Sequence, residues 1–225
     1  MSRELIRMSA VVGISAGRPG RVTDNAVRMI LEATGLESVF FSLGRPDMKM
    51  CLACSRCVES NRCALDDELG EIALAMERAE AVVFGAPQYW TGVNARARGF
   101  WERICFSGRH REVFPLEGKP ALMVTVSGSG EVSPAIRDLE AFMSDARLRV
   151  VDQVSLQGEY ACFTCGYGPT CMVGGYVGMY EPGTPVTRER IPCIANQYPH
   201  LPERLGDARP RLRRAGQKLA RELEG

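Results

Sequence analysis

Short runs of consecutive apolar residues alternate along the chain with segments whose apolar positions recur every three or four residues. A fully apolar run is typical of a strand buried on both faces, whereas the second spacing is typical of an amphipathic helix. The apolar runs predict five strands, at residues 11–14, 39–43, 81–85, 122–126 and 148–154. The periodic segments predict five helices, which begin near residues 23 and 66 and cover residues 94–105, 134–145 and 205–223. This order indicates an α/β fold, with a parallel sheet of five strands and helices on both faces.

Polar residues stand at the expected starts of the first two helices. Thr23 or Asp24 is the candidate cap of the first helix and Asp66 that of the second, because short polar side chains accept hydrogen bonds from the unpaired N–H groups of a first turn. In the last helix, the residues expected to face the core are Leu212, Ala215, Leu219 and Leu223.

Two segments interrupt the alternation within what we expect to be a single domain over residues 1–225. One is a cysteine-rich loop at about residues 45–65, after the second predicted strand. The other is an irregular insert at about residues 158–202, which is rich in Gly, Pro, Tyr and Cys. Irregular stretches of that length in a compact domain are usually functional or disordered.

The composition fits a soluble protein of the cell interior. With 225 residues, 45% of them hydrophobic, the chain can bury one substantial core. Lys and Arg number 28 against 27 Asp and Glu, so no overall positive field favours nucleic acid. Nine cysteines, an odd count, would be unusual for a secreted disulfide scaffold, and no apolar stretch is long enough for a signal peptide or a membrane span. We therefore expect a cytoplasmic location.

The cysteines of the first irregular segment form a C-x2-C-x2-C-x5-C run, made up of Cys51, Cys54, Cys57 and Cys63. Iron–sulfur ligation favours this tight two-residue spacing, whereas a structural zinc site usually divides its ligands into two separated pairs. The run differs from the bacterial ferredoxin pattern, which ends C-x3-C-P. The spacing favours a [4Fe–4S] cluster; zinc and reduced thiols without metal stay open as alternatives.

A second group of cysteines lies in the insert and consists of Cys162, Cys165, Cys171 and Cys193. Four thiols there would suit a second cluster or a zinc ion, and such an anchor would order a long loop. Redox-active thiols beside a cofactor, or small buried side chains, stay open as alternatives.

Three loops follow predicted strands at the edge where open α/β sheets bind their ligands. Residues 15–23 contain hydroxyls and an arginine before a helix start, which suits a phosphate group. The same residues match neither G-x-G-x-x-G nor a P-loop. Residues 85–94 carry Tyr89 and Trp90, which would either flank a planar ring or pack in the core. Residues 127–131 form a third loop of small residues.

Together these motifs resemble the iron–sulfur flavoprotein branch of the flavodoxin-like NAD(P)H-dependent FMN reductase family, over about residues 10–154. The segment G-I-S at residues 13–15, with Thr23 further on, is similar to the family's FMN phosphate loop, usually G-I-S-G-S-P-R. Here G-R-P at residues 17–19 replaces S-P-R. Residues 85–92 are similar to the loop that cups the isoalloxazine ring, and residues 127–131 to the loop that borders it. The cysteine run follows the second strand, where that branch carries its cluster motif.

The resemblance implies a flavodoxin-like fold that carries FMN and one [4Fe–4S] cluster. The implied metal ligands are Cys51, Cys54, Cys57 and Cys63. The implied FMN contacts are Ser15, Arg18 and Thr23 at the phosphate and Pro87, Gln88, Tyr89, Trp90, Gly92, Ser127, Gly128, Ser129 and Gly130 around the ring. No catalytic residue is assigned.

The implied activity is that of an FMN-dependent oxidoreductase. Electrons from a low-potential donor such as ferredoxin would pass through the cluster to FMN and then to a two-electron acceptor. NAD(P)H is a further candidate donor. Because the family brings cluster and flavin together across subunits, we expect a homo-oligomer, either a dimer or a tetramer, and no nucleic-acid or membrane partner.

Three other functions stay open. The first is an NAD(P)H-dependent FMN or quinone reductase without a cluster. The second is a dedicated reductase of one small metabolite, with the insert at residues 158–202 as its lid. The third is a non-catalytic metal-binding or redox-sensing module.

The remaining conspicuous residues have simpler interpretations. Cys105 lies on an apolar helix face and is expected to pack in the core. The surroundings of His110 and His200 indicate neither a Cys–His nucleophile nor a His-based metal site. Arg56 either tunes the cluster or is solvated. A basic stretch, expected to be a solvated helix face rather than a docking site for an acidic electron carrier, consists of Arg209, Arg211, Arg213 and Arg214.

Overall fold

The computed structural model describes residues 10–44, 48–110, 114–128, 130–158 and 202–224. Its strands are β1 (Val11–Ser15), β2 (Ser38–Ser42), β3 (Ala81–Tyr89), β4 (Gly92–Val93), β5 (Pro120–Ser127) and β6 (Arg149–Gln157). Its helices are α2 (Val22–Thr34), the 3₁₀ helix η1 (Arg56–Val58), α3 (Leu69–Arg78), α4 (Ala95–Ser107), α5 (Ser133–Asp145) and α9 (Pro202–Glu224).

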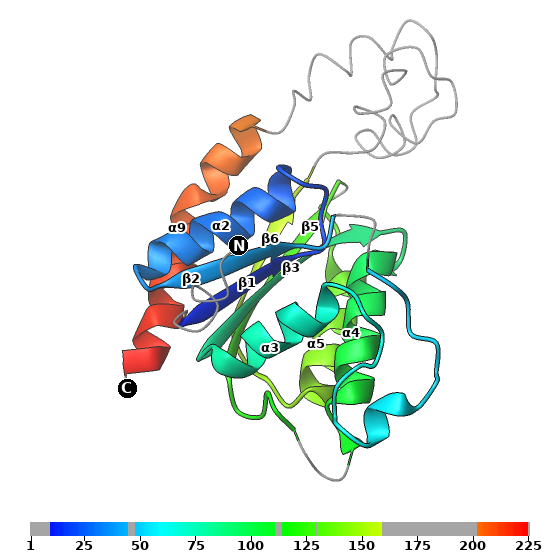
Figure 1. The fold of residues 1–225 in the computed structure, drawn as a ribbon. Helices are drawn as coiled ribbons and strands as arrows, with labels where there is room; N and C mark the ends of the chain where they lie inside the picture. Colours follow the sequence, from blue (N-terminus) through cyan, green and yellow to red (C-terminus); the bar gives the residue numbers. More distant parts are fainter. Residues whose placement is uncertain (1–9, 45–47, 111–113, 129, 159–201, 225) are drawn as a thin grey trace, which may run out of the picture.

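The strands form one sheet in the order β2-β1-β3-β5-β6 (Figure 1). Each neighbouring pair in this order is parallel, and β4 adds a short antiparallel strand beside β3. Leaving β4 aside, this is the 2-1-3-4-5 order of flavodoxin-like doubly wound sheets. The predicted α/β class and its five parallel strands are confirmed, and β4 is a sixth strand that the sequence pattern did not indicate.

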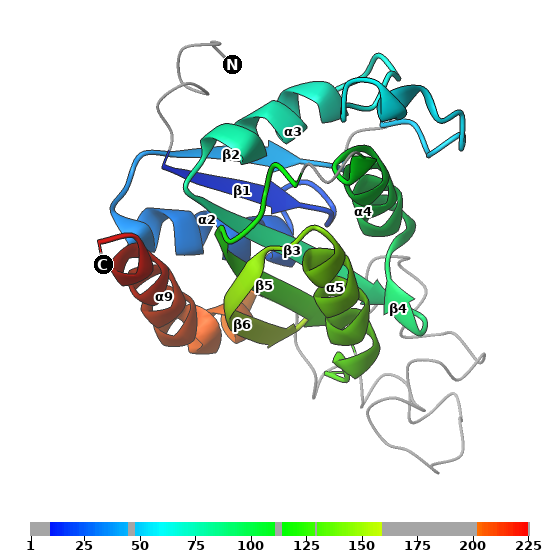
Figure 2. The ribbon, with the colours of Figure 1, turned by 90° about the horizontal axis from the view of Figure 1, so that it is seen from below.

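Helices cover both faces of the sheet (Figure 2). On one side lie α2 and α9, and on the other lie α3, α4 and α5. Alternate residues of one strand enter different cores: Val12 packs toward α3, α4 and α5, whereas Val11 packs toward α2 and α9. Burial on both faces is the reason that the strands appear in the sequence as continuous apolar runs.

Two glycines let α2 lie directly against the sheet. A Cβ atom on Gly13 of β1 would lie 2.5 Å from Leu31 Cδ1, and one on Gly85 of β3 would lie 2.7 Å from Val27 Cγ2. Larger residues at these positions would push the helix away from the strands. The close approach places the amino end of α2 beside the carboxyl ends of β1 and β3.

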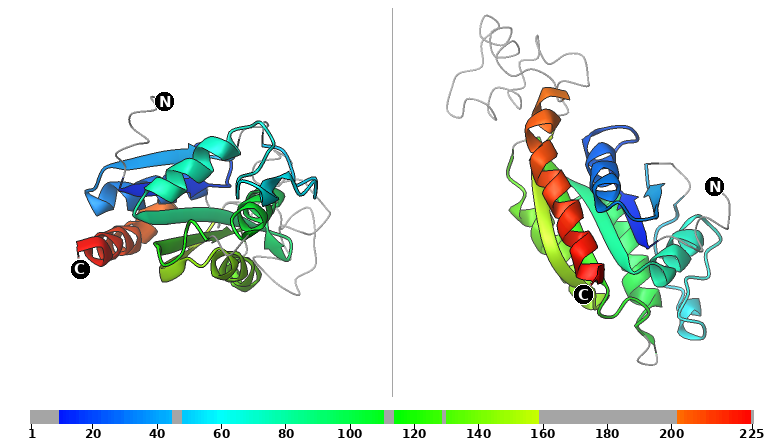
Figure 3. Two further views of the ribbon diagram at one scale, coloured as in Figure 1. Left: turned by 60° about the horizontal axis from the view of Figure 1, so that its bottom comes forward. Right: turned by 90° about the vertical axis from the view of Figure 1, so that its left-hand side faces the viewer.

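The last helix packs along α2 and the edge strand β6 (Figure 3). The predicted inward residues Leu212, Ala215 and Leu219 are buried there, and Leu223 is partly buried. At Gly216 the backbones of the two helices approach closely, since a Cβ atom there would lie 2.5 Å from the carbonyl oxygen of Ile30.

The predicted helix caps are wrong. Helix α2 begins at Val22, so Thr23 and Asp24 already lie inside its first turn, and Asp24 instead accepts a hydrogen bond from Gly20 N at 2.9 Å. Helix α3 begins at Leu69, too far along the chain for Asp66 to cap it. Its neighbour Asp67 accepts from Leu69 N at 3.2 Å.

The segment expected as a loop over residues 85–94 is largely a hairpin. Strand β3 continues to Tyr89, because Pro87 still pairs with β5 and Tyr89 pairs with Gly92 of β4. A two-residue turn, Trp90 and Thr91, joins the two strands. Strand β6 likewise continues to Gln157, three residues beyond the predicted end.

The insert predicted at residues 158–202 falls almost wholly outside the described residues. None of the described helices is both long enough and apolar enough to cross a membrane.

Replacing Gly216 with Ala tests the packing of α9 on α2. We expect Gly216→Ala to lower the free energy of unfolding by about 1–3 kcal/mol, since the added methyl group would overlap the backbone of α2. Gly70→Ala is the matched control, because nothing lies within 4 Å of the corresponding position in α3. Alanine there should leave stability unchanged or raise it by up to about 1 kcal/mol. Urea denaturation measures both; equal effects would contradict the close packing.

Candidate functional site

The loop after β1 brings together two of the predicted phosphate contacts. Ser15 is fully buried at the strand end, and its Oγ accepts a hydrogen bond from Gly17 N at 3.2 Å. A Cβ atom on Gly17 would lie 2.8 Å from Thr23 Oγ1 and 3.4 Å from Ser15 Oγ, so both hydroxyls converge on this point. Arg18 follows on the exposed rim of the loop. Because the first N–H groups of a helix have no intrahelical partner, the start of α2 beside these hydroxyls suits an anion.

Asn94 connects this loop to α4. Its Oδ1 caps the helix by accepting from Ala97 N at 3.2 Å, and its Nδ2 donates to the carbonyl of Ala16 at 2.7 Å. The side chain is buried, so both contacts are shielded from water. The sequence placed Asn94 at a helix start but contained no sign of the contact with Ala16.

The β3–β4 hairpin presents its aromatic side chains to solvent. Tyr89 is 49% exposed and Trp90 is 96% exposed, so the interpretation of the two rings as a core pair is wrong. Asp138 of α5 holds the hairpin, because its Oδ2 accepts from Val93 N at 2.9 Å and from Arg98 at 2.8 Å. Gly92 has to be small there, since a Cβ atom would lie 2.5 Å from the same carboxylate.

The loop after β5 lies beside this hairpin. The carbonyl of Ser127 accepts from Gly130 N at 3.3 Å and Gly158 N at 2.7 Å. Gln88 joins hairpin and loop: its Nε2 donates to Glu131 O at 2.7 Å and its Oε1 accepts from Ala135 N at 3.2 Å. The amide of Gln88 therefore supports the loop.

All three loops follow the carboxyl ends of parallel strands and meet at one end of the sheet, beside the point between β1 and β3 where the strand order reverses. This is the place at which flavodoxin-like sheets bind FMN. Of the predicted ring contacts, Ser129 lies outside the described residues.

The cysteine loop lies at the outer side of α3 and α4 (Figure 2). Cys54 is exposed, and Cys51, Cys57 and Cys63 are partly buried. Burial raises the pKa of Cys57, and the charges of the other three thiols raise it further. Four thiols on one loop are the donor set of a [4Fe–4S] cluster, in which each iron atom takes its own cysteine.

A single metal ion requires a tighter arrangement, with its ligand atoms about 2.0–2.3 Å from one point. No three His, Cys, Asp or Glu side chains among the described residues are gathered in this way.

Three residues contact the cysteines. The sequence left the role of one of them, Arg56, open and gave the other two no role at this site. Hydrogen bonds from the backbone N–H and then the side chain of Arg56 lower the pKa of Cys54. From α4, Arg103 Nε donates to Cys63 Sγ at 3.2 Å. Beyond the end of α4, His110 Nε2 lies 3.3 Å from Cys57 Sγ, a contact that its sequence surroundings did not indicate.

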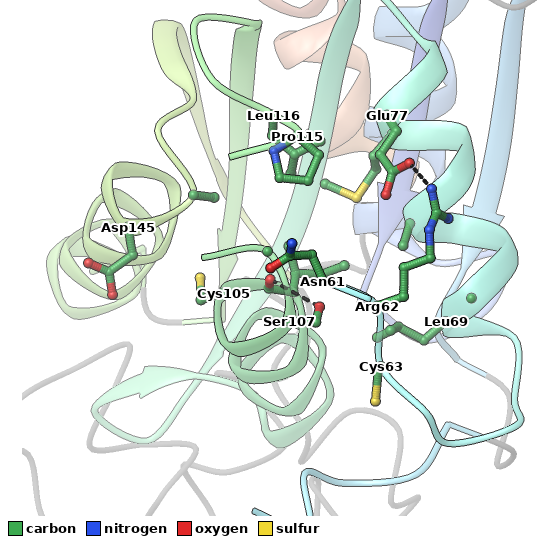
Figure 4. Close-up of a pocket in the computed structure, with 16 residues that line it drawn as sticks. Asn61, Arg62, Cys63, Leu69, Glu77, Cys105, Ser107, Pro115, Leu116 and Asp145 are labelled. Carbon is green, nitrogen blue, oxygen red and sulfur yellow. Dashed lines mark hydrogen bonds and ion pairs between the residues drawn. The ribbon is translucent and has the colours of Figure 1, made fainter. Parts of the chain in front are cut away.

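A cavity of about 150 Å³ lies between the cysteine loop, α3 and α4 (Figure 4). Cys63 and Cys105 both line it, and most of its wall is apolar. Cys105 is buried and donates to the carbonyl of Phe142 at 3.4 Å, and burial raises its pKa to about 12. Its assignment to core packing is confirmed.

The remaining predicted features lie elsewhere. The second cysteine group and His200 fall outside the described residues. The basic stretch of α9, at residues 209–214, presents its arginines to solvent, as predicted. Since α9 covers the opposite face of the sheet from the cysteine loop, a carrier docked there would be remote from the cysteines (Figure 2).

Comparison with known proteins gives concordant matches. The sequence model described as NADPH-dependent FMN reductase matches residues 9–158. An iron–sulfur flavoprotein of Methanocaldococcus jannaschii is 30% identical over 165 residues, 71% of this chain and 84% of that protein. An iron–sulfur flavoprotein of Methanosarcina thermophila is 26% identical over 123 residues, 53% of this chain and 63% of that protein.

Among solved structures, a flavone reductase superposes with a TM-score of 0.58 at 14% identity, over 94% of this chain and 62% of that one. At this identity the likeness concerns the fold alone. The chain spans less than two thirds of the length of the flavone reductase and of the Methanosarcina protein.

The contrast between Cys54 and Cys105 predicts an order of thiol alkylation. In protein freed of metal by chelation under reducing conditions, iodoacetamide at pH 8 should label Cys54 first. Cys105 should react at least about a hundredfold more slowly, because the thiolate is the nucleophile and burial suppresses its formation. Peptide mass spectrometry follows both sites, and in urea the two rates should become similar. Equal rates in the folded protein would contradict the burial of Cys105.

Proposed function

Because this chain belongs to the NADPH-dependent FMN reductase family, as one of its iron–sulfur flavoproteins, we propose that it passes electrons from a low-potential donor such as ferredoxin through a [4Fe–4S] cluster to FMN and on to a two-electron acceptor. The protein is an FMN-dependent oxidoreductase. A cluster exchanges one electron at a time and FMN exchanges two, so the pair joins one-electron donors to two-electron acceptors. We place this reaction in the cytoplasm.

The observation that carries this proposal is that α4 serves both candidate sites. At its amino end, Asn94 hydrogen-bonds the loop after β1. Nine residues later Arg103 contacts Cys63, a distance of about 14 Å along the helix axis. The cysteine loop is therefore held, through Cys63, by the same helix that positions the proposed flavin loop.

In this proposal the cysteines of the run ligate the cluster, and Ser15, Arg18 and Thr23 bind the FMN phosphate. The hairpin and the loop after β5 surround the ring through Pro87, Tyr89, Trp90, Gly92, Ser127, Gly128, Ser129 and Gly130. Gln88, proposed as a ring contact from the sequence, is better suited to fixing the loop after β5, since both polar atoms of its amide are engaged there.

We also propose that the chain works as a homo-oligomer, a dimer or a tetramer. Large apolar side chains are exposed in two regions that would join such an interface, and these are Met50, Leu52 and Val58 in the cysteine loop and Tyr89 and Trp90 in the hairpin. Exposed large apolar side chains that gather in one region are typical of surfaces that another chain covers. In such an oligomer, electrons could also pass from the cysteine loop of one subunit to the flavin loops of its partner.

The decisive experiment measures iron, acid-labile sulfide and FMN per chain in protein purified without oxygen. We expect about four iron, four sulfide and one FMN, the content of one [4Fe–4S] cluster and one flavin. About eight iron would assign a second cluster to the cysteines at residues 162–193. FMN without iron would contradict the cluster and favour the NADPH-dependent reductase that the family description names.

A double replacement, Cys54→Ala with Cys57→Ala, distinguishes electron supply through the cluster from direct reduction of FMN by NADPH. The variant should keep FMN but lose its reduction by reduced ferredoxin. Cys105→Ala is the control, because Cys105 is a buried residue of α4 whose thiol bonds the carbonyl of Phe142, so its loss should leave the iron content unchanged. Rapid bleaching of the flavin by NADPH in the double variant would support the alternative donor.

Ser15→Ala tests the proposed phosphate site. Loss of a buried hydroxyl that would donate to a charged phosphate should raise the dissociation constant for FMN by about tenfold or more. Ser155→Ala, which removes a strand hydroxyl bonded to Thr125, should leave it unchanged. Fluorescence titration of the flavin-free protein gives both constants, and equal affinity of the Ser15 variant and the wild type would remove Ser15 from the site.

A further inference from the structure

Arg103 and Asp67 form an ion pair that is shut off from water. Their side chains are 0% and 2% exposed, and the guanidinium binds the carboxylate through two parallel hydrogen bonds of 2.5 and 2.8 Å. Burial by itself would lower the pKa of Arg103 and raise that of Asp67. Burial is the largest single effect on each group, but the hydrogen bonds and opposite charges around the pair together outweigh it, so the pKa of Arg103 is raised and that of Asp67 is lowered. Both groups are charged at neutral pH.

The pair closes the base of the cysteine loop. Asp67, which follows the last cysteine, accepts from Lys49 N at 2.8 Å, and Arg103 donates to Lys49 O at 2.8 Å. Lys49 stands two residues before Cys51, so one ion pair joins the beginning and the end of the loop to α4. Asp67 also accepts from Leu69 N, where α3 begins.

One nitrogen of the Arg103 guanidinium takes no part in closing the loop and instead contacts a proposed cluster ligand. Arg103 Nε donates to Cys63 Sγ at 3.2 Å. Closing the loop would not require this contact, because the other two nitrogens make the bonds to Asp67 and Lys49. Hydrogen bonds and positive charge at a ligand sulfur favour the more negative, reduced state of a cluster.

Stability alone is a poor explanation for a buried pair in this position. Apolar side chains of similar volume are often as stable or more stable, because two charges lose their hydration when they are buried. The pair therefore has a role that an apolar contact would not fill. Among the described cysteines, the one that Arg103 hydrogen-bonds is Cys63.

We infer that Arg103, fixed by Asp67, is a positioning residue for the cluster: it holds both ends of the cysteine loop and keeps a permanent positive charge against the Cys63 ligand. This inference rests on the proposed function. It predicts that Arg103 slows the loss of iron and raises the reduction potential of the cluster.

Two variants test it. Arg103→Lys keeps a charge for Asp67 but lacks the planar fork that reaches Asp67, Lys49 and Cys63 together. We expect it to fold and to release iron to a chelator several-fold faster than the wild type under anaerobic conditions. The pair Arg103→Gln with Asp67→Asn removes both charges and leaves no buried carboxylate unpaired. The equilibrium constant for one-electron reduction of its cluster should fall by about tenfold. This corresponds to a shift of ~59 mV to more negative potential in an EPR-monitored redox titration.

Arg62→Gln is the matched control. Arg62 precedes Cys63, carries the same charge and pairs with Glu77, but its side chain is 52% exposed. Solvent screens such a charge, so its loss should leave iron release and potential unchanged. A shift as large as that of the double variant would overturn the inference, and so would wild-type potential and iron release in the double variant. If the double variant does not fold, as a loss of FMN binding would show, the rate of iron release from Arg103→Lys decides whether the inference holds.

A measurement on metal-free protein separates this inference from the proposed function. Trypsin cleavage after Arg56 should be several-fold faster in Arg103→Lys than in the wild type, because the base of the loop opens more often. Equal rates would overturn the role of Arg103 in holding the loop. Absence of iron from the wild-type protein would contradict the proposed function, and the cleavage rates would still test the role of Arg103.

Discussion

In a parallel sheet buried on both faces, loops from different strands meet only at the two ends of the sheet, where the strands begin or finish. This constraint organises the molecule. Because β1, β3 and β5 run in the same direction, the segments that follow them emerge side by side. Glycines at positions 13 and 85 then let α2 lie against the strands and bring its amino end to the same edge. The proposed FMN site therefore depends on strand direction and on the absence of two side chains.

Helix α4 links this edge to the cysteine loop. Asn94 caps its amino end and holds the loop after β1, while Gly99 leaves room for Met50 and Arg103 contacts Cys63. Gly99 and Arg103 are one turn apart, so they lie on the same face of the helix. A rigid element that contacts both candidate sites keeps their separation constant, as electron transfer between two cofactors requires.

Charges near the cysteines differ sharply in their surroundings. Arg56 and Arg62 lie in the exposed part of the loop, where solvent weakens their fields. Arg103 is enclosed, and its charge acts in a medium of low dielectric constant. Arg56 and Arg103 both contact a cysteine of the run. Arg103 is the buried one, and it holds the chain on both sides of the cysteines. Protein environments set the properties of iron–sulfur centres through such enclosed donors.

The sequence by itself determined the element types, the α/β class and the four neighbouring thiols, because apolar periodicity and ligand spacing are local properties of the chain. Element ends depended on partners distant in sequence: β3 extends to Tyr89 because β5 and β4 pair with it, and Asp67 rather than Asp66 meets the start of α3. The contacts of Arg103 and His110 with the cysteines join residues 40 and 53 positions apart. Only the tertiary structure placed them together, since burial of α4 against α5 and the sheet determines which of its side chains reach the loop.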